Sequence, residues 1–488
     1  MLFNSYLFIF VFFPLFVAGY FLLNRLPSRK PALWFVICMS LIFYGYDHVR
    51  YVPVIVSSIL VNYAVSRLLV SGTLLQKDAH RKLLLALGIA FDLGLIFYFK
   101  YYDFFFENIN NAFHTSFEMK YLLLPLGISF FTFQQVSFVA DSYRGETAGY
   151  GFAEYAAFVT FFPQLVAGPI VLHKELIPQF RDEEKRRPDW DNLFDGAVRF
   201  SLGLFKKVMI ADTFARAVDW GFANEELATS GDLMLVMLAY TFQIYFDFSG
   251  YSDMATGLAR MVNLTLPINF DSPYKSFTIR EFWKRWHMTL TRFLTTYVYI
   301  PLGGNRKGLV RVCVNTFIVF LLSGIWHGAN WTFILWGVLH GVLCILERLF
   351  EKTVAKAHVA AQWIGTFLTV NVLWLLFRAE NITQWKNMML KIVSFENLSL
   401  NGELLNTFLV PERELFFYLL HLHDVNAAVR GFSMILFVLA AFLICLCFEN
   451  NYRRTIRHNI PTILLASCAF VWAVISLGSE SVFLYFNF

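Results

Sequence analysis

Three of the eleven histidines lie in segments that also carry apolar runs, where an imidazole could do chemistry away from bulk water: His287, His327 and His340. An ionisable side chain at the centre of a membrane helix costs roughly 2.5–3.5 kcal/mol on insertion scales, so such a residue is a functional candidate. A neutral imidazole in a dry cleft suits general-base catalysis. The other eight lie in or beside expected loops, where we expect solvated side chains: His48, His80, His114, His173, His358, His421, His423 and His458.

The segment around His327 reads LLSGIWHGANWTFILWGVLHG, with glycines at 324, 328, 337 and 341. Glycines at this spacing let helices approach closely, and they also bring backbone near a ligand. They would present His327, with Asn330 and Trp331 beside it, in a tight cleft. The spacing leaves two roles open for His327, a general base or a structural histidine between helices. For His340, which would lie about 220° further round a continuous helix, we expect a structural role.

Residues 275–300 do not resemble a lipid-facing span. On a helix, Arg280, Lys284 and His287 would fall on one stripe, while aromatic side chains including Trp286 fall elsewhere. A basic face beside a Trp/Phe face is typical of an interfacial or re-entrant helix. His287 is then a second site residue or merely interfacial.

A further polar cluster, YTFQIYFDFSGYSDMATGLAR, interrupts an apolar run. Asp247 and Asp253 are six residues apart and cannot share a helix face, so a paired-carboxylate site is not expected. Gly250 suggests a helix break, where such side chains satisfy freed backbone groups. That structural role is favoured, and the functional alternative is a cavity lined by Asp247 and Tyr251.

Charged side chains elsewhere have simpler interpretations. Asp141 and Arg144 are expected to pair at a helix end. The Gly-rich turn at 303–308 carries Arg306 and Lys307, which could grip a phosphate-bearing donor. Cytoplasmic loop charges explain the same two residues.

Composition fixes the class of protein. The 488 residues are 57% hydrophobic, 18% aromatic and only 15% charged, against about 25% charged in soluble domains. The chain is therefore predicted to be a polytopic membrane protein, which excludes a soluble enzyme, a secreted disulfide scaffold and a disordered binder. A net charge of +5 is too small to indicate nucleic-acid binding. The six cysteines lie in apolar runs without zinc-ligand spacing, and no metal site is expected.

The predicted fold is all-α, with one integral domain over 1–488 and eleven or twelve transmembrane helices plus re-entrant or interfacial pieces. Met1–Leu23 is expected to be a first span and not a cleaved signal peptide. The apolar runs are 1–24, 31–47, 51–70, 82–100, 121–140, 152–171, 196–218, 233–256, 312–326, 331–349, 361–378, 431–448 and 461–478.

Lys/Arg clusters in short loops orient the chain. Placing the clusters near residues 25–30, 77–82, 306–311, 352–356 and 453–457 in the cytoplasm puts both termini outside. The polar segment 379–430 would then lie outside, where a partner could dock. The topology of 141–200 is ambiguous because its charges are mixed.

Several catalytic motifs are missing. The sequence has no Walker loop, no G-x-S-x-G elbow and no H-E-x-x-H pair. A covalent serine hydrolase and a zinc enzyme are therefore disfavoured.

Six motifs, in the same order along about residues 1–350, resemble the membrane-bound O-acyltransferase (MBOAT) family, in its bacterial alginate and peptidoglycan O-acetyltransferase branch. The motif-bearing core spans about 120–350. The motifs are LPLGISFFTFQ (124–134), FFPQLVAGPI (161–170), QIYFDFSGYSDM (243–254), EFWKRWH (281–287), YIPLGGNRKG (299–308) and LSGIWHG (322–328).

The resemblance implies a helical ring around a funnel, with His327 as the catalytic histidine and His287 as the second family histidine. His327 would take the proton of the acceptor hydroxyl, while His287 or the amide of Asn330 would orient the donor or polarise its carbonyl. The implied donor is cytosolic acetyl-CoA, used as a substrate. The implied partners are an extracytoplasmic SGNH-type acetyltransferase and, indirectly, a polysaccharide. The implied location is the bacterial inner (cytoplasmic) membrane.

Two alternatives to this function stay open. One is D-alanyl transfer from a carrier protein toward teichoic acid, the related branch of the same family. The other is a non-catalytic transporter or flippase of an acylated intermediate, which intramembrane polar groups and broken helices also suit.

Overall fold

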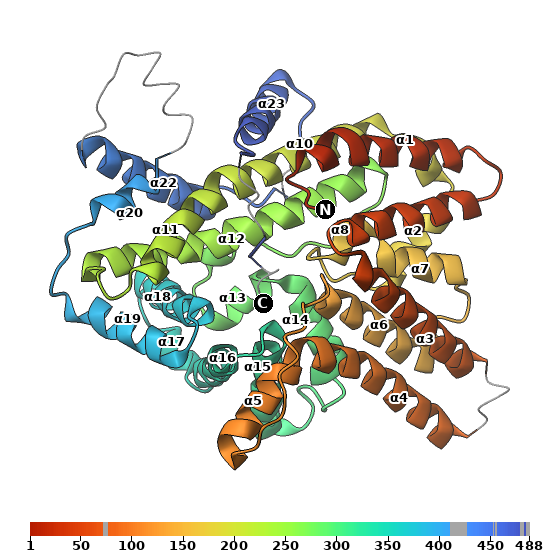
Figure 1. The fold of residues 1–488 in the computed structure, drawn as a ribbon, viewed down its shortest axis with the longest axis horizontal. Coiled ribbons are helices and arrows are strands. Elements are labelled where there is room, and N and C mark those ends of the chain that lie inside the picture. The colour runs from red at the N-terminus through yellow and green to blue at the C-terminus, as the bar shows by residue number, and fades with distance from the viewer. Residues whose placement is uncertain (72–76, 410–426, 452, 454–455, 479–482, 485–488) are drawn as a thin grey trace. The chain divides into compact units, whose positions relative to one another are not determined.

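The computed structural model describes residues 1–71, 77–409, 427–451, 453, 456–478 and 483–484, and this part of the chain is helical with no strand. The predicted all-α fold is confirmed. The chain forms two compact units, residues 1–200 with 254–268 (unit 1) and residues 201–253 with 269–488 (unit 2). It passes between them inside α10 (Trp190–Phe205), inside α12 (Ser230–Met261) and again between residues 268 and 269 (Figure 1). The single integral domain stays a prediction.

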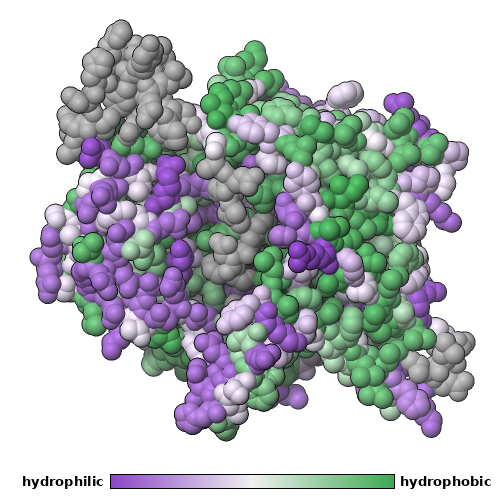
Figure 2. Space-filling view, in the orientation of Figure 1, coloured by the Kyte–Doolittle hydropathy of each residue, from purple (hydrophilic) through white to green (hydrophobic). Residues whose placement is uncertain are grey.

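Seven helices in the described chain are long and apolar enough to cross a membrane, and three shorter helices are apolar as well. Figure 2 shows hydrophobic residues over much of the surface of α1–α4 and hydrophilic residues gathered over α19. The protein is a multi-pass membrane protein, while the number of eleven or twelve crossings stays a prediction. The seven long segments are Val49–Val70, Asp78–Phe113, Ser230–Met261, Gly308–His327, Trp331–Leu349, Val359–Arg378 and Val429–Cys447, and the shorter ones are Phe8–Asn24, Lys30–Gly45 and Ile460–Ile475.

Unit 1 packs around aromatic rings and a few buried polar pairs. The Phe162 ring lies 4.9 Å from that of Phe16 and 5.2 Å from that of Phe43. Buried Asn62 donates to the Asp92 carboxyl at 2.7 Å. Such pairs cross-link helices whose polar groups have no water to bind. The helices are α1 (Phe13–Asn24), α2 (Lys30–Gly45), α3 (Val52–Val70), α4 (Asp78–Ile96), α5 (Tyr102–Phe113), α6 (Ile128–Tyr143), α7 (Phe152–Thr160), α8 (Phe162–Leu165), α9 (His173–Arg181) and most of α10.

Two expected spans of unit 1 differ from the structure. The run 121–140 becomes helical only at Ile128, after Gly127 with φ of +67°. The run 152–171 is broken at Phe161 (φ −49°, ψ 104°), two residues before Pro163. Proline has no N–H to continue the helical ladder, so α7 and α8 are separate.

Unit 2 carries the motif-rich half of the chain. Its helices are the end of α10, α11 (Asp212–Ala223), most of α12, α13 (Ile279–Arg285), α14 (Met288–Leu294), α15 (Gly308–His327), α16 (Trp331–Leu349), α17 (Glu351–Val354), α18 (Val359–Arg378), α19 (Ile382–Ser394), α20 (Gly402–Asn406), α22 (Ala427–Cys447) and α23 (Ile460–Ile475).

The helix break expected at Gly250 is wrong, because α12 is continuous from Ser230 to Met261. A Cβ atom on Gly250 would lie 2.8 Å from the carbonyl oxygen of Gly203 in α10. The glycine therefore permits close packing of two helices and does not interrupt one.

The expected close approach at the 324/337 glycines is confirmed. A Cβ atom on Gly324 would lie 2.4 Å from the carbonyl oxygen of Phe333 and 3.0 Å from the Cα atom of Gly337. The backbones of α15 and α16 are therefore in contact, with no room for a side chain between them.

Gly324→Ala should lower the free energy of unfolding by about 1–3 kcal/mol, because the new methyl group must push α15 away from α16. The measurement is the melting temperature of the purified protein in detergent. Gly365→Ala in α18, where a Cβ atom meets nothing within 4 Å, is the matched control and should be neutral or stabilising. Equal melting temperatures for the two variants would contradict this packing.

Candidate active site

His327 is the last residue of α15 and is buried among aromatic rings. Its ring centroid lies 4.9 Å from that of Trp326, 5.2 Å from that of Trp336 and 5.1 Å from that of Phe377. The helix ends there because Gly328 is extended (φ −169°, ψ 157°). The imidazole thus sits at a helix end in surroundings that exclude water.

His287 lies between α13 and α14 and has φ of +44°, a left-handed conformation that is uncommon for a non-glycine residue. The prediction that His287 shares a helical stripe with Arg280 and Lys284 is therefore wrong. The helix breaks because the Met288 N–H donates to the carbonyl of Asn269 (2.9 Å), outside the helix.

The side chain of Asn269 also holds the His287 ring. Its Oδ1 lies 3.3 Å from His287 Nδ1 and accepts a hydrogen bond from the Thr289 hydroxyl at 2.6 Å. An amide oxygen only accepts, so Nδ1 carries the proton and Nε2 keeps its lone pair. Burial lowers the pKa of His287 to about 3, so its imidazole is neutral at physiological pH.

The Trp326 ring contacts both His287 and His327. Its centroid lies 6.0 Å from that of His287 and 4.9 Å from that of His327. His340 is on α16 and accepts a hydrogen bond at Nδ1 from the Trp283 indole N–H (3.2 Å). That contact fits the structural role expected for it.

Sequence reasoning missed the residue that anchors α13. Glu347 on α16 accepts hydrogen bonds from the backbone N–H groups of Ile279 (2.8 Å) and Arg280 (2.9 Å). The carboxylate satisfies two donors at the start of α13 and ties that helix, and so the His287 turn, to α16. The available signal was an acid in an otherwise apolar helix.

A cavity of about 230 Å³ runs between α13, α14, α15 and α16. Its α15 wall runs from Cys313 to Ser323, one helical turn before His327, and spans roughly 15 Å. Three cations lie in its lining: Arg280, Lys284 and Arg348. Arg280 pairs with Glu347 and Glu351, whereas Lys284 and Arg348 make no ion pair within the described chain.

Other predicted site residues have different surroundings. Trp286 is buried, with its ring 4.8 Å from that of Trp374. Asn330 caps α16 by accepting from the Thr332 N–H (3.0 Å) and donates to the Glu380 carbonyl (2.8 Å). Trp331 is 53% exposed, and the basic turn residues Arg306 and Lys307 are exposed and do not line the cavity.

Asp247 and Tyr251 lie in a buried part of unit 2. Asp247 is 2.6 Å from Lys207 Nζ and accepts from the backbone N–H of Leu484 at 2.9 Å. Phe483 packs on Tyr251 (4.7 Å between ring centroids) and on Phe248 (5.9 Å), and the Phe248 ring lies 4.8 Å from that of His287. Nothing in the sequence indicated that residues 483–484 pack near His287.

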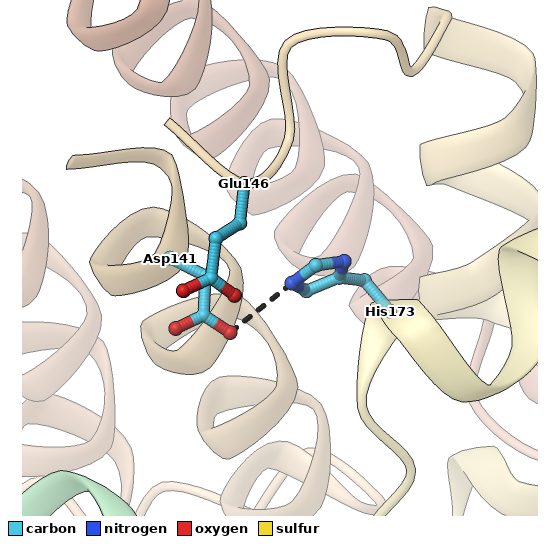
Figure 3. Close-up of side chains that lie close together, drawn as sticks. All are labelled: Asp141, Glu146 and His173. Atoms are coloured by element: carbon cyan, nitrogen blue, oxygen red, sulfur yellow. Dashed lines mark hydrogen bonds and ion pairs between the residues drawn. The ribbon is translucent and has the colours of Figure 1, made fainter. Parts of the chain in front are cut away.

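The expectation that His173 is a solvated loop residue is wrong. It is buried in unit 1, not solvated, and its Nε2 lies 3.1 Å from Asp141 Oδ2 (Figure 3). The predicted Asp141–Arg144 pair is present at 2.9 Å. Asp141, Glu146 and His173 could together hold a metal ion. Arg144 already neutralises the Asp141 carboxylate, which favours an ion-paired structural cluster.

Unit 2 therefore has features that suit a buried acyl-transfer site: two buried imidazoles on one indole ring, and a cation-lined cavity whose wall includes Ser323, one helical turn before His327. The model of the membrane-bound O-acyltransferase family matches residues 31–383, and the chain belongs to this family. It is an acyltransferase.

Named relatives agree with that family. The chain is similar to the peptidoglycan O-acetyltransferase of Helicobacter pylori, 39% identical over 531 aligned residues that cover 100% of this chain and 98% of the relative. It is 42% identical to the probable alginate O-acetylase of Pseudomonas putida, covering 78% of each chain. The teichoic acid D-alanyltransferase of Streptococcus thermophilus is 29% identical, covering 52% of this chain and 68% of the relative.

Asn269→Ala should lower kcat by roughly 10–100-fold, because losing a hydrogen bond to a buried group costs about 1–3 kcal/mol. Asn269→Asp keeps an acceptor opposite Nδ1 but adds a buried negative charge, which raises the pKa of His287. The acidic limb of the pH–rate profile should then move to higher pH in the Asp variant. An unchanged profile and an unchanged kcat would show that Asn269 does not position His287.

Proposed function

We propose that this protein takes an acetyl group from cytosolic acetyl-CoA and passes it across the bacterial inner membrane for O-acetylation of a cell-wall or extracellular polysaccharide. The observation that carries the proposal is a cavity lined by Lys284 and Arg348, which make no ion pair within the described residues, and by Ser323, one helical turn before buried His327. The acceptors named for the similar proteins, peptidoglycan and alginate, support the substrate class.

The shape and charge of the cavity favour a thioester on a long flexible arm. The α15 wall of the cavity spans roughly 15 Å along the helix, a length that a linear arm can follow. Cations in the lining suit the phosphates of a donor whose nucleotide stays outside. The end of α15 and α16 that carries Cys313 and Arg348 also adjoins the 306–311 and 352–356 clusters, which the positive-inside rule assigns to the cytoplasm.

In the proposed mechanism His327 accepts the acceptor hydroxyl proton as the oxygen attacks the thioester carbonyl carbon. The C–S bond then breaks, and the proton passes to the departing thiolate. His287 keeps its Nε2 lone pair, so it can orient the donor by accepting from an amide N–H but does not polarise the carbonyl.

A hydrogen-bond donor for the developing oxyanion is also required. Asn330 caps α16 through its amide oxygen and gives one of its two amide N–H groups to the Glu380 carbonyl. Trp336 has a buried indole N–H that meets no acceptor in the described part of the chain, and its ring contacts His327. We assign the oxyanion donor to Trp336.

The proposed partners follow from the proposed transfer of the acetyl group across the membrane. An extracytoplasmic SGNH-type acetyltransferase would receive the acetyl group, with the 379–430 segment as its docking surface. Part of that segment, 410–426, lies outside the described residues. D-alanyl transfer has weaker support, because the D-alanyl relative shares less identity over a smaller part of the chain.

His327→Ala should abolish CoA release from acetyl-CoA by the purified protein in nanodiscs, since no other base replaces the imidazole. His80→Ala, an exposed histidine in unit 1, is the matched control and should release CoA at the wild-type rate. CoA release at the wild-type rate by folded His327→Ala protein would contradict the mechanism. Turnover only with an aminoacyl-carrier thioester would move the protein to the D-alanyl branch.

Arg348→Glu or Lys284→Glu should raise KM for acetyl-CoA about tenfold with little change in kcat, because a phosphate contact is lost away from the reacting atoms. Acetyl-pantetheine, which lacks the nucleotide, should show no such rise. Arg306→Glu, exposed and outside the cavity lining, is the charge-matched control. If all three variants bind acetyl-CoA like wild type, this cavity is not the donor entrance.

A further inference from the structure

Unit 2 has a second cavity, of about 430 Å³, with lining residues on α10, α12, α22 and α23. Its walls are mainly apolar, with Phe205, Ile444 and Trp472 among them. None of its lining residues belongs to the cavity between α13 and α16. Nothing in the proposed reaction uses this space.

The polar end of this cavity is built from fixed side chains. Lys206, which lines it, has Nζ 2.6 Å from Asp253 Oδ2, and Asn451 donates to the same oxygen at 2.7 Å. Asn450 donates to the Phe270 carbonyl at 2.8 Å. These bonds hold Lys206 and both amides at the rim without any ligand.

The charges at the rim do not select an anion. Lys206 is neutralised by Asp253, and Glu449, also in the lining, adds one negative charge, so the three sum to −1. A rim with both signs and two amides complements a headgroup that also carries both signs.

Size and position restrict the occupant further. A volume of 430 Å³ falls within the usual range of about 300–1,000 Å³ for ligand pockets. Water does not fill an apolar cavity stably. Two of the walls are α22 and α23, whose exposed sides are apolar enough to face lipid. The ligand available there is a membrane lipid.

We infer that this cavity binds one acyl chain of a zwitterionic glycerophospholipid, with its headgroup at Lys206, Glu449 and Asn451. Tyr245 lines the cavity, and its ring lies 6.2 Å from that of Trp286, the neighbour of His287. A bound chain would therefore support the wall behind the His287 turn. The binding site itself does not depend on the proposed function.

The test is native mass spectrometry of the purified protein after exchange into detergent, with phosphatidylethanolamine or phosphatidylglycerol added back. Wild type should retain one phosphatidylethanolamine per chain. Ala469→Trp, which fills the cavity from α23, should retain about tenfold less. Leu464→Trp, the same residue introduced at a 59% exposed position of α23, is the matched control and should retain lipid like wild type.

A photoactivatable phosphatidylethanolamine with its diazirine in the acyl chain gives an independent readout. It should label peptides that contain Phe205 or Trp472 in wild type and in Leu464→Trp but not in Ala469→Trp. Equal retention and labelling in all three proteins, or retention of phosphatidylglycerol alone, would overturn the inference. Melting temperatures of the variants show whether any loss reflects unfolding.

Discussion

The contact between the backbones of α15 and α16 at Gly324 and Gly337 is the constraint on which the candidate active site depends. It sets Trp336 of α16 against His327 at the end of α15. The same helix presents Glu347, which holds the start of α13 and thereby the His287 turn. Both histidines thus take their positions from α16. A side chain between the two helices would separate His327 from Trp336 without touching either imidazole.

Burial gives the His287 imidazole its chemical character. Desolvation penalises the charged ring and lowers the pKa of His287 to about 3, so this imidazole stays neutral and keeps a lone pair at physiological pH. The hydrogen bond to Asn269 decides which nitrogen of His287 holds that lone pair. In the proposed mechanism, the exclusion of water leaves a ring nitrogen as the main acceptor for the proton that the hydroxyl loses. The aromatic cluster around Trp326 and Trp336 would then serve the chemistry as well as the packing.

The sequence predicted the helical membrane class, the close approach at Gly324 and the burial of His327, since composition and local spacing determine these features. It was wrong where tertiary contacts override local periodicity. The helix through His287 breaks because Met288 bonds to Asn269, eighteen residues before His287, and α12 continues through Gly250 because α10 packs there. His173 looked like a loop residue but pairs with Asp141, thirty-two residues earlier. Glu347, Lys284 and Arg348 acquire their roles only when distant helices meet. The acid in a mostly apolar helix marked Glu347 as unusual, but its partners on α13 cannot be found from local spacing.

The central claim is that a cytosolic thioester reaches His327 through the cavity between α13 and α16. The most direct test is a structure of the protein with a non-hydrolysable acetyl-CoA analogue in which a methylene group replaces the thioester sulfur. The account predicts that the analogue's phosphates lie at Lys284 and Arg348 and that its carbonyl carbon lies within about 4 Å of a ring nitrogen of His327 or of the acceptor oxygen that His327 activates. An analogue bound elsewhere, with this cavity empty, would contradict the account.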